Sequence, residues 1–303
     1  MNHIPIPKWL VPAIGILAFI AAVGGLLPGK GQPYPMTNFR GEQVIINGSG
    51  LYQWDTVSSA AQMQANDVVT LALGLPLLAI AYSRARRGSL RGQLLLTGTL
   101  GFILYTYITM CFGAAYNQLF LVYVALFSLS LLAFILSMMS FDLKTLPAQF
   151  SHRLPRRWIA GLLFFIAAFL SLAWLGRIVA TFAPGAVPLL ENVTSMFIQA
   201  LDLGIVLPLC VLAGILLLRR NAWGYLLASV ALIKFLTLGV AVSLMSLNMA
   251  RVGATISAAE LIMFPAIAVA TLITVVVLLR NISGRIDEGE KGQEVGFPAS
   301  LQE

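Results

Sequence analysis

The chain has 303 residues, of which 59% are hydrophobic and only 10% are charged, and its mean hydropathy is +0.88. This composition excludes an ordinary soluble globular protein and is typical of a polytopic membrane protein. The net charge of +7 does not indicate a nucleic-acid partner. The basic residues gather in short clusters at the ends of apolar runs, and such clusters set the orientation of a chain in a membrane.

The first apolar run, 9–27, is long enough to span a bilayer, and we expect a retained first helix rather than a cleaved signal peptide. One long polar connection follows, 28–66. Within it, the stretch 42–54 (EQVIINGSGLYQW) has two β-prone runs on either side of Asn47-Gly48, which predicts a hairpin turning at that dipeptide. The stretch 56–65 alternates small and polar residues, which predicts a short helix on the membrane surface before a span begins at Asp67.

Seven further apolar runs follow the loop. The predicted fold class is therefore all-α, a polytopic membrane helix bundle of eight transmembrane helices. We expect a single membrane domain, 1–280, and a disordered cytoplasmic tail, 281–303, because the tail is polar and has no apolar periodicity. The later spans are predicted at about 67–82, 92–114, 117–140, 158–182, 194–218, 222–249 and 255–279.

The basic residues predict the orientation of these spans. If the amino terminus is cytoplasmic, most of the 19 Lys and Arg residues lie inside, and the loops outside keep only Lys30, Arg40 and Arg251. The positive-inside rule therefore places both termini in the cytoplasm and the 28–66 loop outside.

The eight helices also suggest two repeats of four. Asp67 stands seventeen residues before Arg84, and Asp202 stands seventeen residues before Arg219. Each of these helices contains a proline, Pro76 or Pro208, and each is followed by a Gly-x-Leu-Leu run. Two parallel repeats would explain the pattern, and chance similarity among Leu-rich helices is the alternative.

Four charged residues fall inside predicted spans: Arg177, Asp202, Lys234 and Glu260. A charge near the middle of a spanning helix costs about 2.5 to 3.5 kcal/mol on insertion scales, so each needs a partner, a cavity or a ligand. An axial rise of 1.5 Å per residue puts Lys234 ~16 Å above the basic end of its helix, near the midplane, and the other three at ~25 to ~30 Å.

The direction in which helical side chains lean decides between possible pairs. Asp202 leans outward and Lys234 leans inward, whereas Arg177 leans down toward Asp202. We therefore favour an Asp202–Arg177 pair over an Asp202–Lys234 pair, with Glu260 joining from the last helix. The alternative is a purely structural pair that fixes helix register, with Glu260 simply in water at a helix end.

The candidate substrate- or ion-binding residues combine these charges with polar neighbours at similar depth. Gln199 shares the face of Asp202, and the tyrosines and serines lie within a turn or two of the height of Lys234. No catalytic set, cofactor or metal site is predicted, because the chain has only His3 and His152, and Cys111 and Cys210 lie in apolar runs. The full candidate set is Asp202, Lys234, Arg177, Glu260, Gln199, Tyr105, Tyr107, Ser128 and Ser130.

Several segments resemble a group of prokaryotic multi-pass integral membrane proteins with no assigned activity. They are 113–130 (GAAYNQLFLVYVALFSLS), 88–92 (GSLRG), 202–204 (DLG) and 219–225 (RRNAWGY). The resemblance covers most of the membrane portion and implies a bacterial or archaeal inner membrane as the location.

Three functions fit these features. The first is transport or permeation of a small solute or ion through an outward-facing polar pocket in helices five to eight. The second is a receptor or assembly subunit that binds a partner or ligand through the 28–66 loop. The third, an intramembrane enzyme, is disfavoured, because the scattered acids and few histidines give no Ser-His, paired-aspartate or metal arrangement. The oligomeric state is left open.

Overall fold

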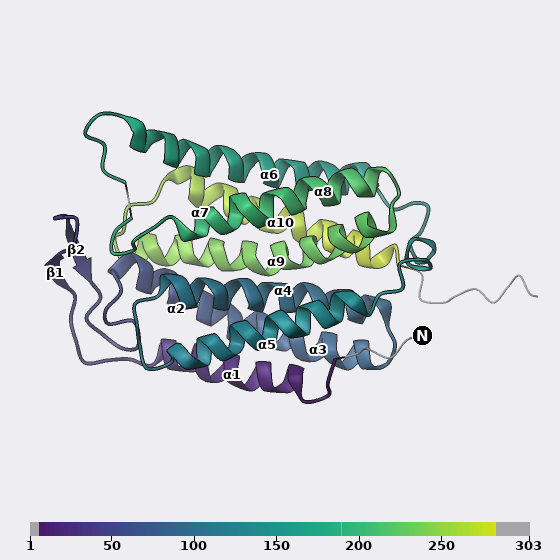
Figure 1. Ribbon diagram of the computed structural model, residues 1–303, viewed down its shortest axis with the longest axis horizontal. Helices are drawn as coiled ribbons and strands as arrows, with labels where there is room; N and C mark the ends of the chain where they lie inside the picture. Colours follow the sequence, from purple (N-terminus) through teal and green to yellow (C-terminus); the bar gives the residue numbers. More distant parts are fainter. Residues whose placement is uncertain (1–5, 189, 283–303) are drawn as a thin grey trace, which may run out of the picture.

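The computed structural model describes residues 6–188 and 190–282. Its helices run side by side along one axis, and a small β-hairpin lies beyond one end (Figure 1). The strands are β1 (Tyr34–Thr37) and β2 (Gln43–Ile46). The helices are α1 (Leu10–Leu26), α2 (Val57–Val69), α3 (Leu75–Arg86), α4 (Leu90–Gly113), α5 (Phe120–Met139), α6 (Arg156–Val179), α7 (Phe197–Leu201), α8 (Leu207–Leu218), α9 (Ala222–Arg251) and α10 (Ala258–Arg280).

Seven helices in the described part of the chain are long and apolar enough to cross a membrane. Two of them are compound: α2 and α3 join through a π-helical turn, Thr70–Gly74, and α7 and α8 join through another, Asp202–Val206. The remaining helix, α1, is apolar but has 17 residues, or ~26 Å, slightly less than the ~30 Å hydrocarbon core. The multi-pass helical bundle is confirmed with seven such helices, and an eighth span at α1 stays a prediction.

The predicted hairpin exists, but its predicted turn is wrong. β1 pairs antiparallel with β2, from Tyr34 opposite Ile46 to Thr37 opposite Gln43, so the turn is 38–42. Asn47-Gly48 follows β2 and begins a second, wider turn, in which the Gly48 N–H donates to the Gln53 carbonyl. Asn-Gly favours a tight turn locally, but the partner strand comes from residues before β2, which local turn chemistry does not identify.

The segment 56–65 is not a separate surface helix. Thr56 caps the amino terminus of α2 by accepting a hydrogen bond from the Ser59 N–H, and the helix continues through Asp67 to Arg86. The span predicted to start at Asp67 therefore starts ten residues earlier, at Val57. This first part of the helix packs against the rest of the bundle, since Ala60, Ala61, Ala65 and Asn66 are buried.

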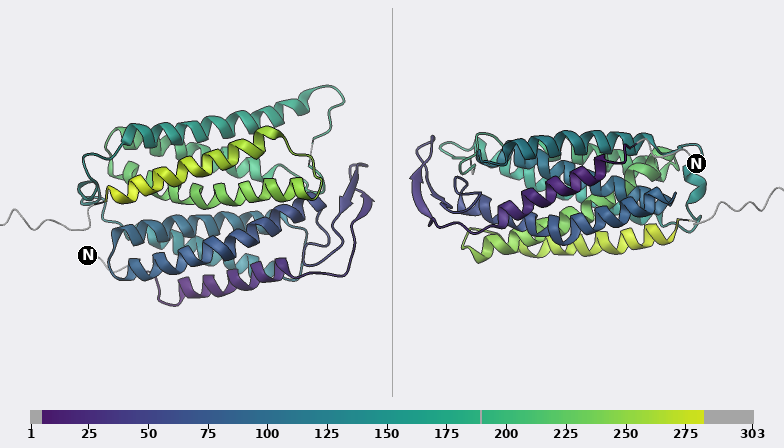
Figure 2. Two further views of the ribbon diagram at one scale, coloured as in Figure 1. Left: turned by 180° about the vertical axis from the view of Figure 1, so that it is seen from behind. Right: turned by 90° about the horizontal axis from the view of Figure 1, so that it is seen from below.

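The bundle has two chemically different ends. The carboxyl ends of α3, α8 and α10 and the amino ends of α4, α6 and α9 meet at one end, which we call the basic end because most of the predicted cytoplasmic Arg residues lie there. The β1–β2 hairpin lies at the other end, which we call the hairpin end (Figures 1 and 2). The charge bias read from the sequence therefore matches the alternation of the helices.

The helices divide into two halves. The first half (α1 to α5) and the second half (α6 to α10) form adjacent groups, purple to teal and green to yellow in Figures 1 and 2. One hydrophobic core lies mainly in each half, and α4 and α9 contribute to both cores. Helices α4 and α9 pack together at the centre, α2 packs on α9, and α7 packs on α4.

Corresponding local features support a repeat. In each half a π-helical turn is followed by Leu-Pro, then by an inter-helix turn with a positive φ, then by a side chain that caps the next helix. Proline lacks an N–H, and the wider π-helical turn just before it accommodates the lost hydrogen bond. The corresponding residues are Pro76 and Pro208, Gly88 and Arg220, and Ser89 and Asn221.

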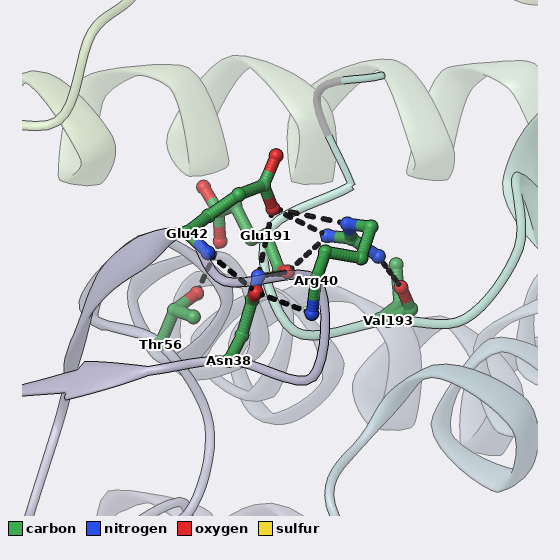
Figure 3. Close-up of polar contacts among 6 residues, drawn as sticks. All are labelled: Asn38, Arg40, Glu42, Thr56, Glu191 and Val193. Atoms are coloured by element: carbon green, nitrogen blue, oxygen red, sulfur yellow. Dashed lines mark hydrogen bonds and ion pairs between the residues drawn. The ribbon is translucent and has the colours of Figure 1, made fainter. Parts of the chain in front are cut away.

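The hairpin is fixed to the second half by polar contacts, which we call the hairpin clamp. Asn38 and Arg40 in the hairpin turn both donate to the main-chain carbonyl of Glu191, and Arg40 also donates to the Val193 carbonyl, N–O 3.0 Å (Figure 3). Glu42 pairs with Arg40 at 2.9 Å. The hydrogen bonds from Asn38 and Arg40 hold the pKa of the Glu42 carboxyl below its usual value. The Thr56 hydroxyl donates to the Glu191 carboxylate.

Candidate functional site

A buried polar cluster lies where the two halves meet. It contains Tyr105 of α4, Trp174 of α6, Asp202 in the second π-helical turn and Lys234 of α9, and we call it the central cluster. Asp202 is buried, and its two carboxylate oxygens accept one hydrogen bond each, from the Tyr105 hydroxyl at 2.8 Å and from the Trp174 indole N–H at 2.9 Å. Both donors are neutral, so the carboxylate is satisfied without a bonded cation.

Lys234 is the unsatisfied member of the cluster. Its ammonium nitrogen is buried and has no hydrogen-bond partner in the described part of the chain. It lies 4.0 Å from the ring centroid of Tyr105 and 5.0 Å from that of Phe235. A desolvated cation–π contact is worth about 2 kcal/mol, well below the cost of an unbonded ammonium in a protein interior. The site therefore presents spare hydrogen-bond donors.

The sequence of α4 explains how Lys234 reaches Tyr105. A Cβ atom at Gly98 would lie 2.5 Å from the Ile233 side chain, and one at Gly101 would lie 3.8 Å from Cγ of Lys234. These glycines remove side-chain bulk from the face of α4 that meets α9, so the two helices pack closely. Tyr105, one turn beyond Gly101, then lies under the lysine on the same face.

Asp202 accepts hydrogen bonds from Tyr105 and Trp174, which the sequence did not indicate. The Arg177 side chain is exposed, and the Asp202–Arg177 pair stays a prediction. Glu260 is exposed and forms a capping box with Ser257 at the amino end of α10. This agrees with the alternative given above, in which Glu260 lies in water at a helix end.

The remaining predicted residues separate into different parts of the bundle. Gln199 is buried one turn before Asp202. The Tyr107 hydroxyl donates to the Ala18 carbonyl at 3.4 Å, and its ring stacks on Tyr123 in the first half. The Ser130 hydroxyl donates to the Phe127 carbonyl within its own helix, and Ser128 is exposed. Of the four polar neighbours predicted for Lys234, the structure brings Tyr105 to it, through its ring face.

Two residues that form buried polar contacts were not identified from the sequence. Trp174 binds Asp202, and its position three residues before Arg177 places both on one face of α6, which is a signal that the sequence contains. Asp67 is a second buried acid inside a compound helix, and it accepts a hydrogen bond from the Tyr52 hydroxyl at 2.7 Å. From the sequence, Asp67 marks the start of a span and supports a repeat, and it is not among the candidate site residues.

Two pockets open at the hairpin end. The larger has a volume of about 480 Å³ and lies between the end of α1, the turn that follows β2 and the α4–α5 loop; Leu51, Trp54, Tyr116 and Asn117 are among its lining residues. The smaller, about 160 Å³, lies beside it and is lined partly by Asp55 and Thr194. Lys234 lines neither of these pockets, so its ammonium is sealed from both.

No protein-family model, curated protein or solved structure matches the chain. The resemblance noted from the sequence therefore leads to no identified family. The seven long apolar helices show that the chain is a multi-pass integral membrane protein whose helices contact the lipid bilayer.

Proposed function

We propose that the chain transports, or allows permeation of, a small solute or ion, and that its binding site is the central cluster. The observation that carries the proposal is the buried Lys234 ammonium, which has no hydrogen-bond partner in the described part of the chain and lies where the two halves meet. A lysine kept only for packing would be replaced with little loss by an apolar residue of similar length.

The chemistry of the cluster favours an anionic or carbonyl group on the cargo. Each oxygen of Asp202 already accepts one hydrogen bond, from Tyr105 or from Trp174, whereas the Lys234 ammonium donates none within the described part of the chain. Two similar halves around one buried site, each with a proline-interrupted helix, also fit the general design of secondary transporters. In this proposal the structure is a closed state, and rocking of one half against the other opens the site. Orientation follows the charge bias, with both termini in the cytoplasm of a cell with an inner membrane.

Lys234→Met tests this proposal. We expect the purified variant to be at least as thermally stable as the wild type, because a desolvated, unbonded charge is replaced by an apolar side chain of similar length. We also expect chloride, acetate or phosphate to raise the melting temperature of the wild type and not that of the variant. Flux of the stabilising anion into liposomes should be lost in parallel. Tyr105→Phe, which keeps the ring and removes the bond to Asp202, should weaken flux without abolishing it.

Lys144→Met is the matched control, because Lys144 is an exposed lysine of the loop after α5. It should leave anion stabilisation and flux unchanged. A Lys234→Met protein that is strongly destabilised, or that responds to the anions as the wild type does, contradicts the proposal and leaves Lys234 a structural residue.

The larger pocket at the hairpin end supports a second candidate, a receptor or assembly subunit that binds a ligand through the 28–66 loop. The two functions differ in their dependence on Trp54, which is 55% exposed and lines both pockets. A receptor loses its response when Trp54 is changed to Ala, whereas flux through the central cluster does not need this side chain.

A further inference from the structure

The first half contains a buried acid that the central cluster does not use. Asp67 is 3% exposed, and one of its oxygens accepts the hydrogen bond from Tyr52. The backbone of α1 lies directly against this pair: a Cβ atom at Gly25 would lie 1.9 Å from the carboxylate and 2.6 Å from the Tyr52 hydroxyl. Glycine at this position is therefore required for the acid and the phenol to meet.

The surroundings of Asp67 hold no countercharge among the described elements packed on it. Helices α1 and α5 contain no basic residue, and the arginines of α3 and α4 lie at the basic end. On α9, Lys234 faces Tyr105 and Arg251 is exposed at the hairpin end. The titratable groups nearest to Asp67 are the phenols of Tyr52, Tyr107 and Tyr123.

A lone ionised carboxylate in such an environment is costly, and a carboxyl group avoids this cost by holding a proton. The Tyr123 hydroxyl is buried close to the Tyr52 hydroxyl and the Asn117 side chain. Its ring stacks with that of Tyr107, with the ring centroids 6.1 Å apart. A protonated Asp67 would keep its hydrogen bond with the Tyr52 hydroxyl in surroundings of neutral phenols.

The larger pocket is lined by residues that are adjacent in the chain to those that contact this acid. Gly24 and Leu51 line the pocket, and the next residues in the chain, Gly25 and Tyr52, contact Asp67. The volume of about 480 Å³ is far above the ~15 Å³ of probe-occupied space that one water needs. Side-chain amides of Gln53, Asn117 and Gln118 supply polar partners for water there. Gly25 and Tyr52 therefore connect the lining of the pocket to the carboxyl group.

We propose that Asp67 is an exchangeable proton-binding site that communicates with the hairpin-end solution through this pocket. The reaction is the uptake and release of one proton by one carboxyl group, and it involves no other reactant. The site is separate from the central cluster, so the inference goes beyond the proposed transport function and does not depend on it. Its ligand is a proton taken from the solution on that side.

Infrared difference spectroscopy on the full chain in liposomes tests the proposal. At neutral pH we expect the carbonyl-stretch band of a protonated carboxylic acid, which Asp67→Asn removes and Asp202→Asn and Lys234→Met keep. The band should shift within the mixing time after transfer to deuterated buffer. A spectrum in which Asp67→Asn removes no such band overturns the proposal. If Lys234→Met fails its own test while the Asp67 band persists, the two proposals are separated.

Access through the pocket has its own test, which does not require Asp67 to be changed. Gln118 is exposed and lines the pocket, so Gln118→Cys, combined with Cys111→Ser, gives one accessible thiol there. The remaining cysteine, Cys210, is buried. Attaching a bulky maleimide should make deuterium exchange of the Asp67 band slow enough to follow after mixing, whereas exchange in the same protein before labelling is complete within the mixing time. Exchange at an unchanged rate shows that the proton does not pass this way and overturns the proposed route.

Discussion

Tyr105 contacts two opposite charges with different parts of its side chain. Its hydroxyl donates to Asp202, and its ring face lies under the Lys234 ammonium. Lys234 and Asp202 are not within 4.0 Å of each other, since the ion pair of the described residues is Arg40–Glu42. The Tyr105 side chain therefore contacts both charged groups, the carboxylate through its hydroxyl and the ammonium through its ring face.

A different acid, Asp55, provides a pH prediction outside the membrane spans. One of its oxygens accepts the Ala115 N–H at 2.8 Å, and the other is buried without a partner in the described part of the chain. Burial raises the pKa of Asp55 to about 6, and the bond from Ala115 opposes this only partly. The ordinary value is about 3.9, so the folded chain binds the proton more tightly than the unfolded chain does.

The sign follows from proton linkage. The contribution of Asp55 to the free energy of unfolding is fully present below about pH 4. It is lost as the pH rises through about 6, and the loss is up to about 3 kcal/mol. We expect unfolding of the purified protein to show this loss between pH 4 and 7, and Asp55→Asn to remove it. Asp142→Asn is the control, because Asp142 is exposed in the loop after α5 and its pKa is lowered by the Lys144 N–H. A pH profile identical in wild type and Asp55→Asn contradicts the assignment.

At the scale of helices, apolar length and basic clusters predicted the spans well, because both are set by the bilayer. The ends of α4, α9 and α10 fall within three residues of the predicted ones. The equal spacing from acid to arginine in the two halves predicted the wrong correspondence between their residues. Asp202 begins its π-helical turn, whereas Asp67 stands three residues before the other, so the two acids do not correspond. The sequence does not show where an α-helix widens, since that depends on its packing.

The tight turns that join α3 to α4 and α8 to α9 give a test of the repeat. Gly92 and Gly224 each lie three residues after the capping side chain, and each is pressed against the preceding helix. A Cβ atom would lie 2.5 Å from the Ala85 backbone nitrogen in the first case and 2.2 Å from that of Leu217 in the second. Backbone cannot move aside as a side chain can.

We expect Gly92→Ala and Gly224→Ala each to destabilise the protein by about 1 to 3 kcal/mol, with Gly224→Ala the more severe. The measurement is the free energy of unfolding in mixed micelles. Gly161→Ala on α6 is the control, because nothing lies within 4 Å of its added Cβ, and it should gain up to about 1 kcal/mol of helix propensity. Gly92→Ala and Gly224→Ala variants as stable as Gly161→Ala would show that the helix pairs are looser than this geometry requires.

In the whole molecule, the halves meet along α4 and α9, and the hairpin clamp joins them again at the hairpin end. The hairpin belongs to the first half, and Glu191 and Val193 belong to the loop before the π-containing helix of the second. Any motion that separates the halves at this end must break the clamp or carry the hairpin with the second half. Its Arg40 hydrogen bonds join a charged guanidinium to main-chain carbonyls. When desolvated, each such hydrogen bond contributes about 1.5 to 3 kcal/mol to stability. Arg40 keeps some solvent contact, so we expect the lower part of that range.

Arg40→Met should release the hairpin without unfolding the bundle. The rate of hydrogen–deuterium exchange should rise in residues 34–46 and 190–194 and not in α4 or α9. The rise should be roughly tenfold for each 1.4 kcal/mol of contact free energy that the hairpin loses. If the halves rock during transport, the same variant should also raise anion flux, because the closed state loses a restraint that the open state lacks. Lys30→Met, an exposed lysine of the same loop, should change neither quantity. Unaltered exchange in both segments of Arg40→Met would mean that the Arg40 hydrogen bonds have no part in keeping the hairpin on the second half, and that the remaining contacts are enough to hold it there.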